Sequence, residues 1–136
     1  MLLVVQGRMM SDAVETRLAP LGLTLRTMGF LGHLARSPGI SFTDLAARAR
    51  ITVQSTHAVA ARLADDGLID APGRTRGRAA TLRLTEAGRA KLAEAEQAIA
   101  ELDAERFGPD AAPAWQALAH ALFTVARTQL PTPPAS

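Results

Sequence analysis

Apolar residues recur at three- and four-residue spacing near the start of this chain of 136 residues, which is the period of an amphipathic helix. A first helix is expected over about residues 2–18, and Pro20 and Gly22 should end it. One face of this helix carries Val5, Met9, Ala13 and Thr16. A second helix is expected to begin after Thr24, a suitable N-cap, and to end at Ser37, Pro38 and Gly39. Helical spacing there brings together Leu25, Met28, Leu31 and Leu34.

The middle of the chain alternates short helical patterns with signals for turns and strands. Two short helices are expected at residues 43–48 and 54–63, followed by a hairpin at residues 73–78. In the strand that follows, Leu82 and Leu84 alternate with Thr81 and Arg83, so the two leucines are expected to face the core. This order predicts a mainly α fold with a small β wing, a winged helix-turn-helix. In that fold one helix enters the major groove of DNA and the hairpin reaches toward the minor groove.

Two further helices are expected after Thr85, separated by Gly108, Pro109 and Asp110. Their apolar positions follow a spacing close to a coiled-coil seam: Leu92, Ala95, Ile99, Leu102, then Trp115, Leu118, Leu122 and Val125. We expect residues 1–20 and 86–129 to be dimerisation helices, residues 24–85 to be the DNA-binding region, and residues 130–136 to be a disordered tail. A homodimer would set two reading helices about 34 Å apart, one turn of DNA. The alternative is that the terminal helices only complete the core of a monomer.

Positive charge is concentrated in the middle of the chain. The formal net charge is +2, but residues 41–91 hold nine Arg or Lys against five Asp or Glu, so this segment is +4 and the two ends together are −2. A basic middle between neutral or acidic ends is typical of a nucleic-acid face on an otherwise ordinary protein. A GC-rich genome also enriches arginine, but it does not explain three arginines at alternate positions of one hairpin.

The helix at residues 54–63 is the candidate reading helix. A helical wheel places Val53, Thr56, Val59, Ala60 and Leu63 on an inward arc. Thr52 is the expected N-cap, which leaves the positive end of the helix dipole free to meet a phosphate. On the outward arc, Gln54 can pair with adenine, and Ser55 or His57 can bond a base or a phosphate. Arg62 is expected to reach the DNA backbone. The alternatives are a solvated first turn for Gln54 and Ser55, and local packing for His57.

The hairpin is the candidate wing. Gly73 and Gly77 permit the positive φ angles of a tight turn. Three guanidinium groups, from Arg74, Arg76 and Arg78, are expected along one side, and arginine is suited to a narrow minor groove. A solvated basic loop without a ligand is the alternative.

Nothing in the sequence points to catalysis. The three histidines are scattered, the chain has no cysteine, and no carboxylate pair or metal-binding spacing appears. We therefore expect no catalytic residue, no metal, no cofactor and no enzyme activity. The apolar start is interrupted by Gln6, Gly7 and Arg8, and no stretch is long enough to span a membrane. A cytoplasmic protein without a membrane partner is expected.

The segments predicted above, taken in their order along the chain, resemble those of a MarR-family transcriptional regulator. The resemblance rests on the order and spacing of short segments: residues 21–24 (LGLT), 44–46 (DLA), 52–55 (TVQS), Leu63, 67–69 (GLI), 77–78 (GR) and 84–88 (LTEAG). It implies a homodimer joined through the first and last two helices and bound to a pseudo-palindromic operator of double-stranded DNA. It also implies that a small aromatic or anionic effector releases the DNA from a repressor.

Two positions depart from the pattern of the family. Arg76 stands where an acid commonly precedes the Gly-Arg pair of the wing, and this acid usually helps to hold the wing arginine, here Arg78. Ala58 stands where an arginine commonly follows the position of His57. The balance of DNA contacts is therefore expected to move from the helix toward the wing.

The effector crevice implied by the resemblance lies between the dimerisation helices and the reading unit. Candidate residues for it are Met9, Arg26, Phe30, His33 and Trp115, and for each of them a core or surface role is the alternative. For the whole chain, the alternative function is a winged-helix module that binds protein, or an architectural module that binds DNA without sequence preference.

Overall fold

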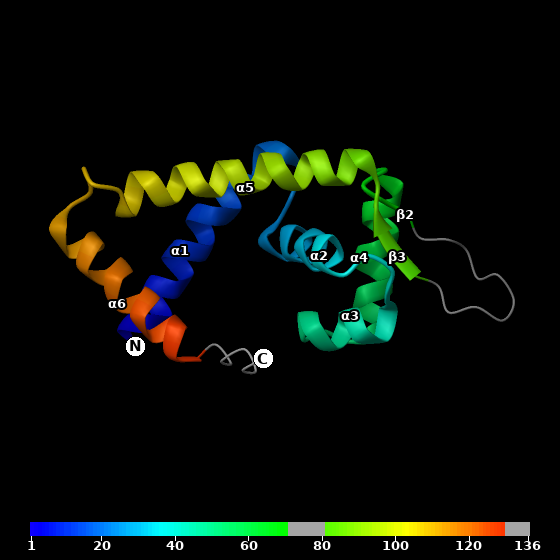
Figure 1. Cartoon of the computed structure of the whole chain (residues 1–136), viewed down its shortest axis with the longest axis horizontal. Helices are drawn as coiled ribbons and strands as arrows, with labels where there is room; N and C mark the ends of the chain where they lie inside the picture. Colours follow the sequence, from blue (N-terminus) through cyan, green and yellow to red (C-terminus); the bar gives the residue numbers. More distant parts are fainter. Residues whose placement is uncertain (71–80, 130–136) are drawn as a thin grey trace, which may run out of the picture. The chain divides into compact units, whose positions relative to one another are not determined.

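The computed structural model describes residues 1–70 and 81–129. Contacts divide the chain into two units, residues 1–98 and 99–136, and each is described by itself. In the first unit α1 (Leu2–Leu18), the short helix η1 (Ala19–Leu21) and α2 (Leu25–Arg36) precede strand β1 (Ile40–Ser41). Helices α3 (Phe42–Ala49) and α4 (Val53–Asp65), strands β2 (Ile69–Asp70) and β3 (Thr81–Leu84), and helix α5 (Glu86–Phe107) follow. Helix α5 begins in the first unit and ends in the second. The fold is mainly helical with a small sheet, as the sequence predicts (Figure 1).

Hydroxyl side chains cap the N-termini of helices α2 and α3. Thr24 accepts a hydrogen bond from the Thr27 amide, and the Thr27 hydroxyl accepts one from the Thr24 amide, which makes a reciprocal capping box. Ser41 caps α3 by accepting from the Asp44 amide at 3.1 Å. Thr24 was predicted to be an N-cap, and the prediction is confirmed.

Helices α2, α3 and α4 pack around one apolar core with strand β3. Its largest fully buried side chains include Phe30, Leu31, Leu34, Leu45, Leu63 and Leu82. The helical wheel predicted that Val53 faces the core, and this prediction was wrong. Val53 is 42% exposed, because it is the first residue of α4 and lies before the part of the helix that packs on the core. Leu25 is also exposed, because the buried face of α2 is centred on Thr27, Phe30, Leu31 and Leu34.

The three strands form one antiparallel sheet in the order β1-β3-β2. Ile40 pairs with Leu82, and Ile69 pairs with Leu84. Leu82 and Leu84 are buried whereas Arg83 is exposed, which confirms the predicted alternation. Residues 71–80 join β2 to β3, so the predicted hairpin lies outside the described residues.

The second unit contains the end of α5 and helix α6 (Pro113–Gln129). The break between α5 and α6 falls where Gly108 and Pro109 predict it. The Gln116 side-chain amide stabilises the connection by donating to the carbonyl oxygens of Gly108, Pro109 and Ala111. The predicted disordered tail at residues 130–136 lies outside the described residues.

Candidate nucleic-acid interface

Helix α4 begins after the predicted N-cap, Thr52. The Thr52 hydroxyl oxygen accepts a hydrogen bond from the Ser55 amide at 3.0 Å and donates to the Ser55 hydroxyl at 2.9 Å. One of the free amides at the start of the helix is thereby satisfied by the side chain of Thr52. The two hydroxyls thus define where α4 starts, and their place at its positive end is compatible with an approaching phosphate.

The two faces of α4 differ as the wheel predicts, apart from Val53. Thr56, Ala60 and Leu63 are buried, and the Thr56 hydroxyl donates to the Thr52 carbonyl oxygen at 3.0 Å. Gln54, His57 and Arg62 are exposed on the other face, and Ser55 is half-buried. Amide, imidazole and guanidinium groups are donors and acceptors suited to base edges and phosphates. The exposed face of α4 therefore has the chemistry of a reading helix.

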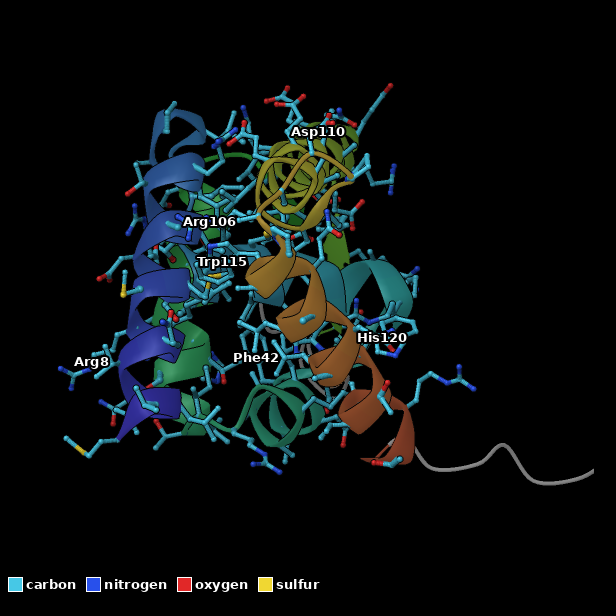
Figure 2. The ribbon with its side chains drawn as sticks, turned by 90° about the vertical axis from the view of Figure 1, so that its left-hand side faces the viewer. Arg8, Phe42, Arg106, Asp110, Trp115 and His120 are labelled. Carbon is cyan, nitrogen blue, oxygen red and sulfur yellow. The ribbon has the colours of Figure 1, made fainter. Side chains whose placement is uncertain are left out.

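His57 is stacked on Phe42, the first residue of α3. The ring centroids lie 3.9 Å apart and the ring planes differ by 18°. Phe42 is half-buried, and Figure 2 labels it. The sequence did not indicate this contact, because the two residues are 15 positions apart in different helices. It connects the two helices of the reading unit directly at the exposed face.

The predicted wing arginines, Arg74, Arg76 and Arg78, and the two wing glycines lie outside the described residues. The strands that flank them are described. Asp70, the last residue of β2, pairs with Arg83 of β3. The described part of the wing therefore consists of two short antiparallel strands anchored in the core by Ile69, Leu82 and Leu84.

A second candidate site is an open cleft of about 510 Å³ in the first unit. It brings together Arg26, Phe30 and His33, three of the five residues predicted for an effector crevice. Met9 does not line it, and Trp115 belongs to the second unit. The full lining is Glu15, Leu25, Arg26, Gly29, Phe30, His33, Ala49, Arg50 and Ile51.

The charges in this cleft favour an anion. Burial lowers the pKa of His33, and the nearby Arg36 and Arg48 lower it further. The Arg36 guanidinium lies 3.4 Å from His33 Nδ1. The lowered pKa favours the neutral imidazole at neutral pH, in which one ring nitrogen donates a hydrogen bond and the other accepts one. Glu15 is the one acid in the lining, and its carboxylate accepts from the Leu25 amide at 3.1 Å, whereas Arg26 and Arg50 supply two positive charges.

Sequence reasoning missed Glu15 and Arg50 as lining residues. Arg50 ends α3 with a left-handed φ of 53°, a conformation usually taken by glycine at this position. No glycine marks the end of α3, so the sequence carried no signal that the chain would turn there and bring Ala49, Arg50 and Ile51 to the cleft.

Trp115 lies in a cluster of its own in the second unit. Its ring meets Phe107 edge-on with centroids 6.0 Å apart, and the Arg106 guanidinium lies 5.7 Å from the Trp115 ring centroid (Figure 2). Such contacts favour a structural role in joining the end of α5 to α6.

Within residues 1–70 and 81–129, no three histidine or acidic side chains are grouped so that they could hold a metal ion. In the same ranges, no helix is both long and apolar enough to cross a membrane.

Comparison with known proteins identifies the family. The sequence model of the MarR family matches residues 21–79. The HTH-type transcriptional repressor Rv2887 of Mycobacterium tuberculosis is 36% identical over 99 residues, which are 72% of this chain and 71% of that protein. A crystal structure of Rv2887 matches with a TM-score of 0.77 at 31% identity, covering 92% of this chain and 91% of that one.

Two further structures of Rv2887 contain ligands. Its complex with DNA matches with a TM-score of 0.74 at 31% identity, over 91% of this chain and 94% of that one. Its complex with salicylic acid matches with a TM-score of 0.67 at 33% identity, over 91% of this chain and 93% of that one. The sequence similarity extends over more than two thirds of both proteins, and the chain therefore belongs to the MarR family.

Proposed function

We propose that this protein is a transcriptional repressor that binds a pseudo-palindromic operator as a homodimer and is released from it by a small aromatic anion. The observation that carries the proposal is the exposed face of α4. It presents Gln54, His57 and Arg62 beside an N-terminus capped by Thr52, and the relative Rv2887 has been crystallised with DNA.

The proposed DNA contacts divide by chemistry. Gln54 is the candidate for reading a base, because its amide can make two hydrogen bonds to adenine. Thr52, Ser55 and Arg62 are candidates for phosphate contacts, which hold the protein in register without reading the sequence. Arg74, Arg76 and Arg78 are the candidates for the wing, and His57 is treated separately below.

Exposed apolar side chains on the terminal helices support the homodimer. Leu2 and Leu3 of α1 are 82% and 80% exposed, and Phe123 of α6 is 68% exposed. Each of these helices leaves apolar surface uncovered within its own unit, which is typical of a surface that meets a partner. The proposal therefore assigns residues 1–20 and 86–129 to dimerisation and residues 24–85 to DNA binding.

The cleft beside α2 supports release by an effector. Leu25, Phe30 and Ile51 offer apolar contacts to a ring, and Arg26 and Arg50 offer charge to a carboxylate. Salicylic acid has both features, and Rv2887 has been crystallised with it. We propose the cleft as the effector site, with Arg26 as its principal anion ligand.

Binding rather than catalysis is the activity proposed for this chain, because its relatives are named as transcriptional repressors. The reading unit and the cleft are the two proposed binding sites.

The experiment is a selection of genomic DNA fragments by the purified protein at near-physiological salt. The proposal predicts one enriched palindrome with half-sites about one helical turn apart. Binding without enrichment, which fades steeply with salt, would contradict it and favour an architectural module.

The effector is tested on the enriched duplex with salicylate. Salicylate is expected to release the wild-type protein, and Arg26→Gln is expected to need a higher concentration of it. Arg26→Lys, which keeps the positive charge at the same position, is the matched control and should respond more like wild type than Arg26→Gln does. Equal responses of the three proteins would remove Arg26 from the effector site.

A further inference from the structure

The stack between Phe42 and His57 joins a half-buried ring to an exposed one. Phe42 comes from the start of α3 and His57 from the second turn of α4, the two helices of the reading unit. The rings are nearly parallel at 3.9 Å, so one face of the imidazole is covered by the phenyl ring. The contact thus lies at the edge of the surface proposed to meet DNA.

The backbone at Phe42 is held from two directions. Ser41, the preceding residue, pairs with Thr81 of the sheet. Its hydroxyl also accepts from the Asp44 amide and donates to the Asp44 carboxylate at 2.8 Å. Since Phe42 follows Ser41 directly at the first position of α3, its ring projects from a fixed point where strand and helix meet.

His57 has no comparable anchor of its own. Within residues 1–70 and 81–129 the stack on Phe42 is the interaction recorded for its ring, and neither ring nitrogen has a hydrogen-bond partner there. An exposed imidazole without a partner exchanges among several staggered rotamers. Stacking restricts the tilt of the ring and leaves both nitrogens at its edge, where they remain open to a ligand.

We propose that Phe42 is a positioning residue for DNA recognition: its ring holds the His57 imidazole so that a ring nitrogen meets the operator. Without the phenyl ring, binding would have to order His57 at the moment of contact, and this loss of freedom weakens affinity. The inference rests on the proposed function, because it needs an operator to be read.

The test measures affinity for the enriched palindrome by fluorescence anisotropy, with wild type, Phe42→Leu, Phe42→Tyr, His57→Ala and the double variant Phe42→Leu/His57→Ala. Leucine keeps apolar cover and removes the ring, whereas tyrosine keeps the ring. Phe42→Leu is expected to weaken binding about 2- to 10-fold per half-site. Phe42→Tyr should keep wild-type affinity. The double variant should bind no more weakly than His57→Ala alone.

Three results would overturn the proposal. The first is that Phe42→Leu binds with wild-type affinity, and the second is that Phe42→Tyr binds as weakly as Phe42→Leu. The third is that Phe42→Leu weakens binding by the same factor in the wild-type protein and in the His57→Ala variant. A wild-type protein without preference for a palindrome would overturn the proposed function itself, and this is seen in the wild-type arm alone.

A measurement on wild-type protein covers the case in which Phe42→Leu fails to fold. Stacking places the imidazole carbon protons of His57 over the phenyl face, so their NMR signals should lie upfield of those of the exposed His120. Signals of His57 at the same position as those of His120 would show that the ring is not held in solution, and would equally overturn the proposal.

Discussion

Replacing Gln54 with alanine separates reading of DNA from folding. Gln54 is exposed on α4, and the structure records no hydrogen bond for its amide within residues 1–70 and 81–129. Removal of the side chain therefore leaves no buried group unsatisfied, and alanine is as good a helix former as glutamine or better. We expect the free energy of unfolding to change by less than about 0.5 kcal/mol.

The effect on DNA binding follows from the hydrogen bonds that the Gln54 amide can make to a base. A bidentate pair between glutamine and adenine contributes about 1–3 kcal/mol of discrimination. A homodimer holds two copies, so Gln54→Ala should weaken operator binding by about 2–6 kcal/mol if the half-sites are independent, which is at least about 30-fold. Binding to a scrambled duplex of the same length should change little, because phosphate contacts carry it.

The assay is fluorescence anisotropy with both duplexes at fixed salt, together with thermal unfolding. The scrambled duplex is the internal control, because binding to it depends on phosphate contacts and not on the Gln54 amide. The reasoning is refuted if Gln54→Ala weakens binding to the two duplexes equally, or if it lowers the melting temperature enough to explain the loss.

Three further predictions concern stability. The pKa of His33 lies below its ordinary value of 6.5, so protonation favours the unfolded chain; stability should fall as the pH decreases from 6.5 through the lower folded pKa. His33→Gln should flatten this part of the profile of melting temperature against pH, and an unchanged profile would assign it to other groups. A Cβ at residue 88 would overlap the Leu68 carbonyl oxygen, so Gly88→Ala should destabilise the fold by about 1–3 kcal/mol. Gly7→Ala, which meets open space in α1, should stabilise by about 0.5–1 kcal/mol, and equal melting shifts would contradict the argument. Removing the Thr52 cap with Thr52→Ala should cost about 1 kcal/mol in urea unfolding, Thr52→Ser should recover most of it, and a loss shared by both would mean that the hydroxyl is not the cause.

Local features were predictable because they depend on a few neighbouring residues. Thr24 can satisfy an amide three positions ahead whatever the rest of the chain does, so its N-cap could be identified from the sequence. The break at Gly108 and Pro109 is equally local. The alternation of Leu82 and Leu84 with Arg83 gave the buried face of β3, because the side chains of a strand alternate.

Features that depend on packing between elements were not predictable. The helical wheel placed Val53 inside because it assumes that the whole length of α4 is covered, whereas Val53, the first residue of the helix, lies beyond the core. The contact of His57 with Phe42 needs the crossing of α3 and α4, which no spacing records. Arg50 is one of nine Arg and Lys side chains in residues 41–91. Its place in the cleft follows from a left-handed turn made without glycine.

The measurement that tests the account most directly is the ratio of affinities for the selected palindrome and a scrambled duplex, with the number of protomers bound to each palindrome. A dimeric repressor predicts two protomers per palindrome and a ratio of about 10³ or more at physiological salt. A ratio near one, with an affinity that follows salt alone, would contradict the claim that α4 reads a sequence.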